Sequence, residues 1–102
     1  MYQVKRHSTS HFVPLRGHQY HVREWGNPQS TLPPLVLAHG WMDVAASWQF
    51  MVASFSDSFI QNRRILAADW RGYGLTTGPA TDSYWLPDYL GDLDALLRQL
   101  CP

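Results

Sequence analysis

The spacing of hydrophobic residues changes along the chain and predicts strands first, then helices between and after further strands. Two runs rich in aromatic and β-branched residues, His11 to Leu15 and His18 to Trp25, predict a β-hairpin with a two-residue turn at Arg16-Gly17. Unbroken apolar runs follow at Leu35 to Ala38 and at residues 65–69, the second closed by an aspartate. Such runs are typical of strands that are covered on both faces in a parallel sheet.

Two other segments show the spacing of helices. Apolar residues recur three and four positions apart over residues 46–56, which predicts a short helix with Asp43 or Ser47 as its N-cap. A longer series of leucines predicts a helix over residues 86–100. The polar residues of this second helix, among them Asp92, are expected away from its apolar face.

The order of these elements predicts an α/β fold in one domain, residues 1–102, with an antiparallel start. Strand, helix and strand between residues 35 and 69 form a βαβ unit, and its right-handed crossover places both strands in one parallel sheet. A helix packed on a parallel sheet normally leads to a further strand, yet only Cys101-Pro102 follows residues 86–100. We therefore expect the sheet to lack a strand.

The composition of the chain limits the kinds of molecule that it is expected to bind. Eight Lys and Arg balance eight Asp and Glu, so the chain lacks the basic excess with which proteins bind nucleic acids or anionic membranes. The single Cys101 allows no internal disulfide and fits a reducing compartment. The polar N-terminus does not resemble a secretory signal, and no apolar stretch approaches the length of a membrane span. These features predict a soluble, cytoplasmic protein.

Two motifs stand where the predicted parallel strands end. The first is His39-Gly40-Trp41-Met42-Asp43, and the second is Asp69-Trp70-Arg71-Gly72-Tyr73-Gly74-Leu75-Thr76. Both are therefore expected at the carboxyl edge of the sheet, where open α/β sheets bind their ligands.

Together these motifs resemble the H-G-x-x and D-x-R-G-x-G-x-S segments of the α/β-hydrolase family, with Thr76 in place of the usual serine. The hairpin, ending in Glu24-Trp25-Gly26, looks like the opening strands of that family. The resemblance implies the N-terminal half of an α/β-hydrolase sheet, truncated before the nucleophile strand. It also implies a parent enzyme that hydrolyses an ester or similar small acyl substrate by nucleophile-His-acid chemistry.

The resemblance also implies roles for individual residues. The backbone N–H of Trp41 would be one oxyanion-hole donor, and such a donor stabilises a developing oxyanion by about 3 to 4 kcal/mol. Gly40, lacking a Cβ, would keep the turn tight and leave that amide open to a ligand. The substrate pocket would be lined by His39, Gly40, Met42 and Trp70. The residues expected to hold the second loop in place are Asp69, Arg71, Gly72 and Gly74, of which Asp69 and Arg71 can pair with each other or cap backbone groups.

The nucleophile, acid and base of the family are absent from the chain. No Gly-x-Ser-x-Gly, nor a version with Asp or Cys, follows the fourth strand, and the elbow is expected just beyond Pro102. We therefore expect no specific hydrolase activity from this chain alone. Neither a metal nor a cofactor is expected, because His18 and His21 face opposite sides of a strand and Thr77 stands where a dinucleotide fingerprint needs glycine.

Two other hypotheses about the function of the chain stay open. The chain could be a non-enzymatic binding module, or one half of a hydrolase assembled from two chains. Family sheets have the strand order 1-2-4-3-5, so by resemblance residues 35–38 would form an open edge, a site for self-association or for the missing C-terminal half. The reaction also stays open, since an Asp at the elbow would act on an epoxide or a haloalkane rather than an ester.

Overall fold

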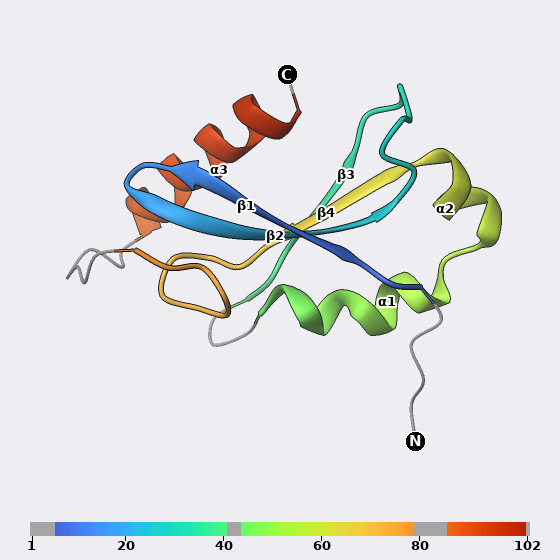
Figure 1. The fold of residues 1–102 in the computed structure, drawn as a ribbon, viewed down its shortest axis with the longest axis horizontal. Helices are drawn as coiled ribbons and strands as arrows, with labels where there is room; N and C mark the ends of the chain where they lie inside the picture. Colours follow the sequence, from blue (N-terminus) through green and yellow to red (C-terminus); the bar gives the residue numbers. More distant parts are fainter. Residues whose placement is uncertain (1–5, 41–43, 79–85, 102) are drawn as a thin grey trace.

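The chain folds around a four-stranded mixed sheet with helices on both faces (Figure 1). The computed structural model describes residues 6–40, 44–78 and 86–101. The strands are β1 (Thr9–Leu15), β2 (His18–Gly26), β3 (Leu35–Ala38) and β4 (Arg64–Ala68). The helices are the 3-10 helix η1 (Ala45–Trp48), α1 (Gln49–Ser54), α2 (Asp57–Asn62) and α3 (Leu86–Leu100).

The strand order is β1-β2-β4-β3, which places the hairpin beside the fourth strand and β3 at an edge. β2 pairs antiparallel with both β1 and β4, whereas β3 pairs parallel with β4. At the hairpin turn Arg16 and Gly17 have φ values of 48° and 85°, as a two-residue turn between twisted strands requires. The predicted fold class, a hairpin followed by a parallel βαβ unit and a helix, is confirmed.

Two apolar clusters lie on opposite faces of the sheet. Beneath α3 the buried residues are Val13, Leu15, Tyr20, Val22, Leu66, Ala68 and Leu96. Beneath η1 and α1 they are Trp25, Leu37, Ala45, Val52, Ile65 and Ala67. β4 contributes alternate residues to both clusters, which explains its unbroken apolar sequence. Each large aliphatic side chain buried in this way stabilises the fold by about 1.5 to 3 kcal/mol.

The segment after β3 differs from the single helix expected over residues 46–56. It begins as η1, continues as α1 and ends where Phe55 adopts an extended conformation. A second helix, α2, then begins at an N-cap that the sequence analysis missed, because the Ser56 hydroxyl accepts a hydrogen bond from the backbone N–H of Phe59. Ser47 lies inside η1 and is not its N-cap, while Asp43 lies outside the described residues.

Helix α3 occupies the predicted range, and Leu96 of its leucine series is buried in the core, but the side that it presents to the sheet also carries a charged residue. Asp92, expected on the polar side, is fully buried, whereas Leu90 and Leu97 are 55% and 37% exposed. The reason is a buried charge partner on a distant loop, described below. None of the described helices has the length and apolar character that crossing a membrane would need.

Candidate functional site

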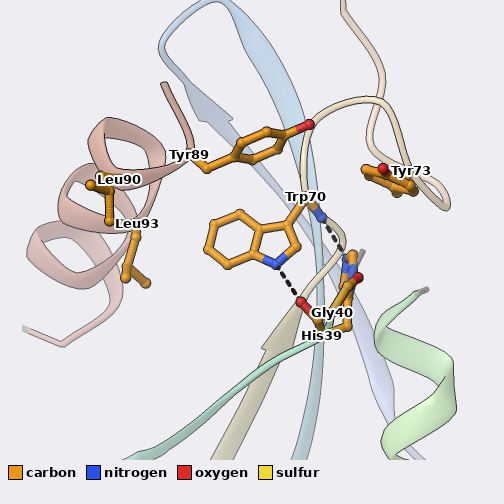
Figure 2. Close-up of a pocket in the computed structure, with 7 residues that line it drawn as sticks. All are labelled: His39, Gly40, Trp70, Tyr73, Tyr89, Leu90 and Leu93. Carbon is orange, nitrogen blue, oxygen red and sulfur yellow. Dashed lines mark hydrogen bonds between the residues drawn. The ribbon is translucent and has the colours of Figure 1, made fainter. Parts of the chain in front are cut away.

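A cavity of about 460 Å³ opens at the carboxyl ends of β3 and β4 (Figure 2). The residues that follow these strands form one wall, and side chains of α3 form another. Among the described residues, the lining consists of His39, Gly40, Trp70, Tyr73, Tyr89, Leu90 and Leu93. The structure thus brings His39, Gly40 and Trp70, three of the residues singled out in the sequence, to one cavity.

His39 ties the two motif loops together with both of its ring nitrogens. Its Nε2 accepts a hydrogen bond from the backbone N–H of Trp70 at 3.0 Å. Since this nitrogen accepts, the ring hydrogen lies on Nδ1, which donates to the Gly40 carbonyl at 2.8 Å. The Trp70 indole N–H donates back to the His39 carbonyl at 3.0 Å (Figure 2). The imidazole therefore fixes the cavity wall and has no nitrogen left to act as a base.

Aromatic rings give the cavity its apolar character. The Trp70 indole meets the Tyr89 ring edge to face at 5.9 Å, and the His39 ring meets Tyr73 at 5.7 Å. The Tyr89 hydroxyl donates to the Arg71 carbonyl at 3.3 Å. Because these polar groups bond within the protein, the surface left to a ligand is mainly carbon. Such a lining suits a small apolar or aromatic group.

Part of the predicted site lies outside the described residues, namely Trp41 and Met42. Gly40 is described, and a Cβ built on it would have no heavy atom of the described residues within 4 Å. Its φ is not among the positive values either. The chain after Gly40 continues into residues outside the described ranges, so the tight turn expected there stays a prediction.

Asp69 organises the second motif and the start of η1. Its carboxylate accepts hydrogen bonds from the backbone N–H groups of Ala45 and Leu75, at 2.7 and 3.0 Å, and from the His21 ring at 2.7 Å. Burial alone would raise the pKa of Asp69, but these hydrogen bonds hold it below the ordinary value of an aspartate. Of the two interactions expected for Asp69, capping of backbone groups is observed and pairing with Arg71 is not.

The loop after β4 contains two glycines and a threonine whose residue types are explained by backbone conformation and contacts. Gly74 has a φ of 55°, and a Cβ there would lie 2.3 Å from the Asp69 carboxyl carbon. Thr76 donates its hydroxyl hydrogen to the Asp69 carbonyl at 2.6 Å and accepts from the His21 backbone N–H at 2.9 Å. Gly72 also has a left-handed φ, 85°. These residues hold the loop in the conformation that places Trp70 and Tyr73 in the cavity.

Arg71 pairs with Asp92 of α3 rather than with Asp69. Its Nε and Nη2 donate to the two oxygens of Asp92, each at 2.6 Å, while Tyr20 and Arg16 also hydrogen-bond that carboxylate. The guanidinium and the tyrosine hydroxyl keep the pKa of Asp92 low despite its burial. The desolvated Tyr20 hydroxyl, beside the same carboxylate, has its pKa raised. This network holds α3 against the loop after β4, and it thereby positions Tyr89 and Leu93 at the cavity.

Sequence reasoning missed His21 and Asp92 as partners of the motif. Each lies far along the chain from the residue it contacts, so no local spacing revealed the pairing. The one local signal was that Asp92 lies between Gly91 and Leu93 in a leucine-rich helix, where a charged residue on the apolar side needs a partner. Among the residues that the structure describes, no group of three or more His, Cys, Asp or Glu side chains could hold a metal ion.

Comparison with known proteins shows which protein family this chain resembles in sequence. The family described as alpha/beta hydrolase fold matches residues 33–101. Epoxide hydrolase A of Mycobacterium tuberculosis is 33% identical over 90 residues, which cover 87% of this chain and 26% of that protein. The chain therefore spans about a quarter of the length of that curated relative.

Solved structures of epoxide hydrolases and of a haloalkane dehalogenase share the fold of this chain. The crystal structure of an epoxide hydrolase from Vigna radiata has a TM-score of 0.73 and 32% identity, covering 91% of this chain and 28% of its own. A haloalkane dehalogenase from Bradyrhizobium elkani has a TM-score of 0.77 at 24% identity, covering 92% of this chain and 30% of its own; at this identity the match speaks for the fold alone. The chain belongs to the α/β-hydrolase fold family.

Proposed function

We propose that this chain is the N-terminal part of a hydrolase that opens a small apolar epoxide. The observation that carries the proposal is the apolar cavity formed where the two motifs meet at the carboxyl ends of β3 and β4. Relatives named as epoxide hydrolases favour this substrate over the ester expected from the sequence. The aromatic walls would hold the carbon skeleton of the substrate and leave its oxygen toward the loop after His39.

In this proposal the chain supplies binding and charge stabilisation, while the reacting groups come from the rest of the protein. The backbone N–H of Trp41 would donate a hydrogen bond to an oxygen that gains negative charge, worth about 3 to 4 kcal/mol. An aspartate on the next strand-to-helix turn would attack an epoxide carbon, and a histidine would activate the water that releases the diol. The chain alone is therefore proposed to have no sustained hydrolase activity. Cytoplasmic localisation stays a prediction.

Substrate preference is tested in the intact protein that carries this chain. A small aryl epoxide and p-nitrophenyl acetate are offered in parallel, and diol and p-nitrophenol are measured. We expect turnover of the epoxide, reduced by at least about tenfold in Trp70→Ala because that indole forms the cavity wall. If the protein hydrolyses p-nitrophenyl acetate but not the epoxide, the epoxide assignment is wrong and the acyl substrate expected from the sequence is supported.

The sheet edge supports a second proposal, that β3 receives the C-terminal half of the hydrolase. Within the described ranges β3 pairs only with β4, so its other edge is open. Beside it lies a groove of about 520 Å³ whose lining includes Val36, Leu97 and Leu100. Size-exclusion chromatography of the chain alone tests this: association or aggregation supports an uncovered interface, and a stable monomer favours the autonomous binding module instead.

A further inference from the structure

A serine, a histidine and an aspartate outside the cavity form a continuous hydrogen-bonded series. The Ser10 hydroxyl lies 2.8 Å from His21 Nε2, and His21 Nδ1 lies 2.7 Å from Asp69 Oδ2. His21 is fully buried and Asp69 is 2% exposed, whereas Ser10 lies exposed on β1. The three residues come from β1, β2 and the loop after β4, and Ser10 and His21 are absent from the cavity lining.

The hydrogen-bond partners determine the direction of this series. Asp69 also accepts from the backbone N–H groups of Ala45 and Leu75, so its carboxylate is an acceptor throughout. The hydrogen on His21 Nδ1 must therefore point to Asp69, which leaves the Nε2 lone pair of the neutral ring facing Ser10. The Ser10 hydroxyl donates to that lone pair. This is the arrangement in which a histidine removes the proton of a serine nucleophile.

A neighbouring hydroxyl and histidine provide an internal comparison. The Thr9 hydroxyl lies 3.4 Å from His11 Nε2, and the same nitrogen lies 3.2 Å from a Glu24 oxygen. That histidine is half exposed, and its carboxylate and hydroxyl compete for one nitrogen. In contrast, His21 uses its two nitrogens for two partners and packs against the Phe12 ring at 5.1 Å. Of these two arrangements, the one at His21 is the one that can relay a proton.

A positive charge lies on the face of the hairpin where Ser10 points. Arg23 is the cross-strand neighbour of Ser10, and its guanidinium donates to the Ser8 hydroxyl at 3.1 Å. The Arg23 Nε is buried and has no hydrogen-bond partner among the described residues. A substrate oxygen that becomes negative during attack by Ser10 would lie near this cation. The favoured reactants are therefore activated carboxylic or phosphonic esters.

We propose that Ser10 is a nucleophile that takes up one acyl or phosphonyl group from a small activated ester. The Ser10 oxygen forms a bond to the carbonyl carbon or phosphorus, the bond to the leaving group breaks, and the serine proton passes through His21 Nε2 to the leaving group. This inference does not depend on the proposed epoxide hydrolase function.

The test is covalent labelling of the intact protein with a fluorophosphonate, followed by peptide mass mapping. Ser58 of α2 is the reference, an exposed serine whose hydroxyl is 3.5 Å from the Asn62 amide nitrogen rather than beside a histidine. We expect Ser10 to be labelled about 100-fold faster than Ser58, the typical gain from a positioned general base. The difference should vanish in urea.

Two variants complete the experiment. Ser10→Ala, at an exposed position that tolerates alanine, should remove this label, while Ser58→Ala should leave it unchanged. Ser10 labelling no faster than Ser58 labelling in the folded protein would overturn the proposal. Equal labelling of Ser10 in the folded and the unfolded protein would overturn it as well. Mapping by peptide separates Ser10 from any nucleophile elsewhere in the protein, so the outcome is independent of the epoxide assay.

Discussion

Asp92 attaches α3 to the rest of the fold through a buried hydrogen-bond network. Its carboxylate accepts from Arg71, Tyr20 and Arg16, and it is buried between β2, the loop after β4 and the helix. The charges of Asp92 and Arg71 compensate each other, because each group has a partner of opposite charge and uses most of its hydrogen-bonding capacity. Removing one partner would leave the other charge buried without compensation, which is more costly than never having buried the pair.

We therefore expect Asp92→Ala to lower the free energy of unfolding by about 3 to 5 kcal/mol, measured by urea denaturation. Asp94→Ala is the matched control on the same helix. Asp94 pairs with Arg98 at 3.1 Å on the exposed side, with 64% and 80% of the side chains accessible. This control should cost no more than about 0.5 kcal/mol. Similar losses in both variants would contradict the role given to Asp92.

Acid should destabilise the protein through the same carboxylates. The pKa values of Asp69 and Asp92 are lower than those of ordinary aspartates. Each group therefore stabilises the fold above its unfolded pKa, about 3.9, and this contribution is lost as the pH falls through the lower folded value. We expect the unfolding free energy to fall below about pH 4 and to change little near neutrality. A loss that begins near neutral pH would contradict the role given to these two carboxylates.

At the scale of the elements, the loop after β4 is shaped by contacts that a side chain at Gly74 would break. Gly74→Ala places a Cβ against the Asp69 carboxylate at a left-handed φ, so we expect a loss of about 1 to 3 kcal/mol in thermal unfolding. Gly40→Ala is the control because its Cβ would meet no described atom within 4 Å. Equal stability of the two variants would show that the loop is not constrained as described.

Sequence periodicity predicted the elements where local pattern decides, and missed what distant contacts decide. The apolar runs at residues 35–38 and 65–68 identified β3 and β4, because strands buried on both faces need no polar positions. The same pattern placed His39 and Trp70 at the sheet edge. It placed Asp92 on the wrong side of its helix, since its partner Arg71 is 21 residues away. It missed α2, whose six residues are too few to show a helical period.

Over the whole molecule, the β3 edge of the sheet and the groove beside it are not covered by the described residues. We expect the chain alone to self-associate through β3 and the groove beside it, because unpaired backbone groups and apolar side chains favour contact there. Leu97→Lys, which places a charge in the groove, should shift the chain toward monomer in size-exclusion chromatography with light scattering. Unchanged association in this variant would mean that another surface is responsible.

We propose that this chain, the N-terminal part of an α/β-hydrolase, works with reacting groups that lie elsewhere in the protein. The most direct test is the native protein's mass and coding sequence beyond Pro102. We predict a further strand followed by Gly-x-Asp-x-Gly, with a histidine far downstream, and a serine at the centre would instead indicate an acyl substrate. A native protein that stops at Pro102 and has no partner chain would contradict the claim.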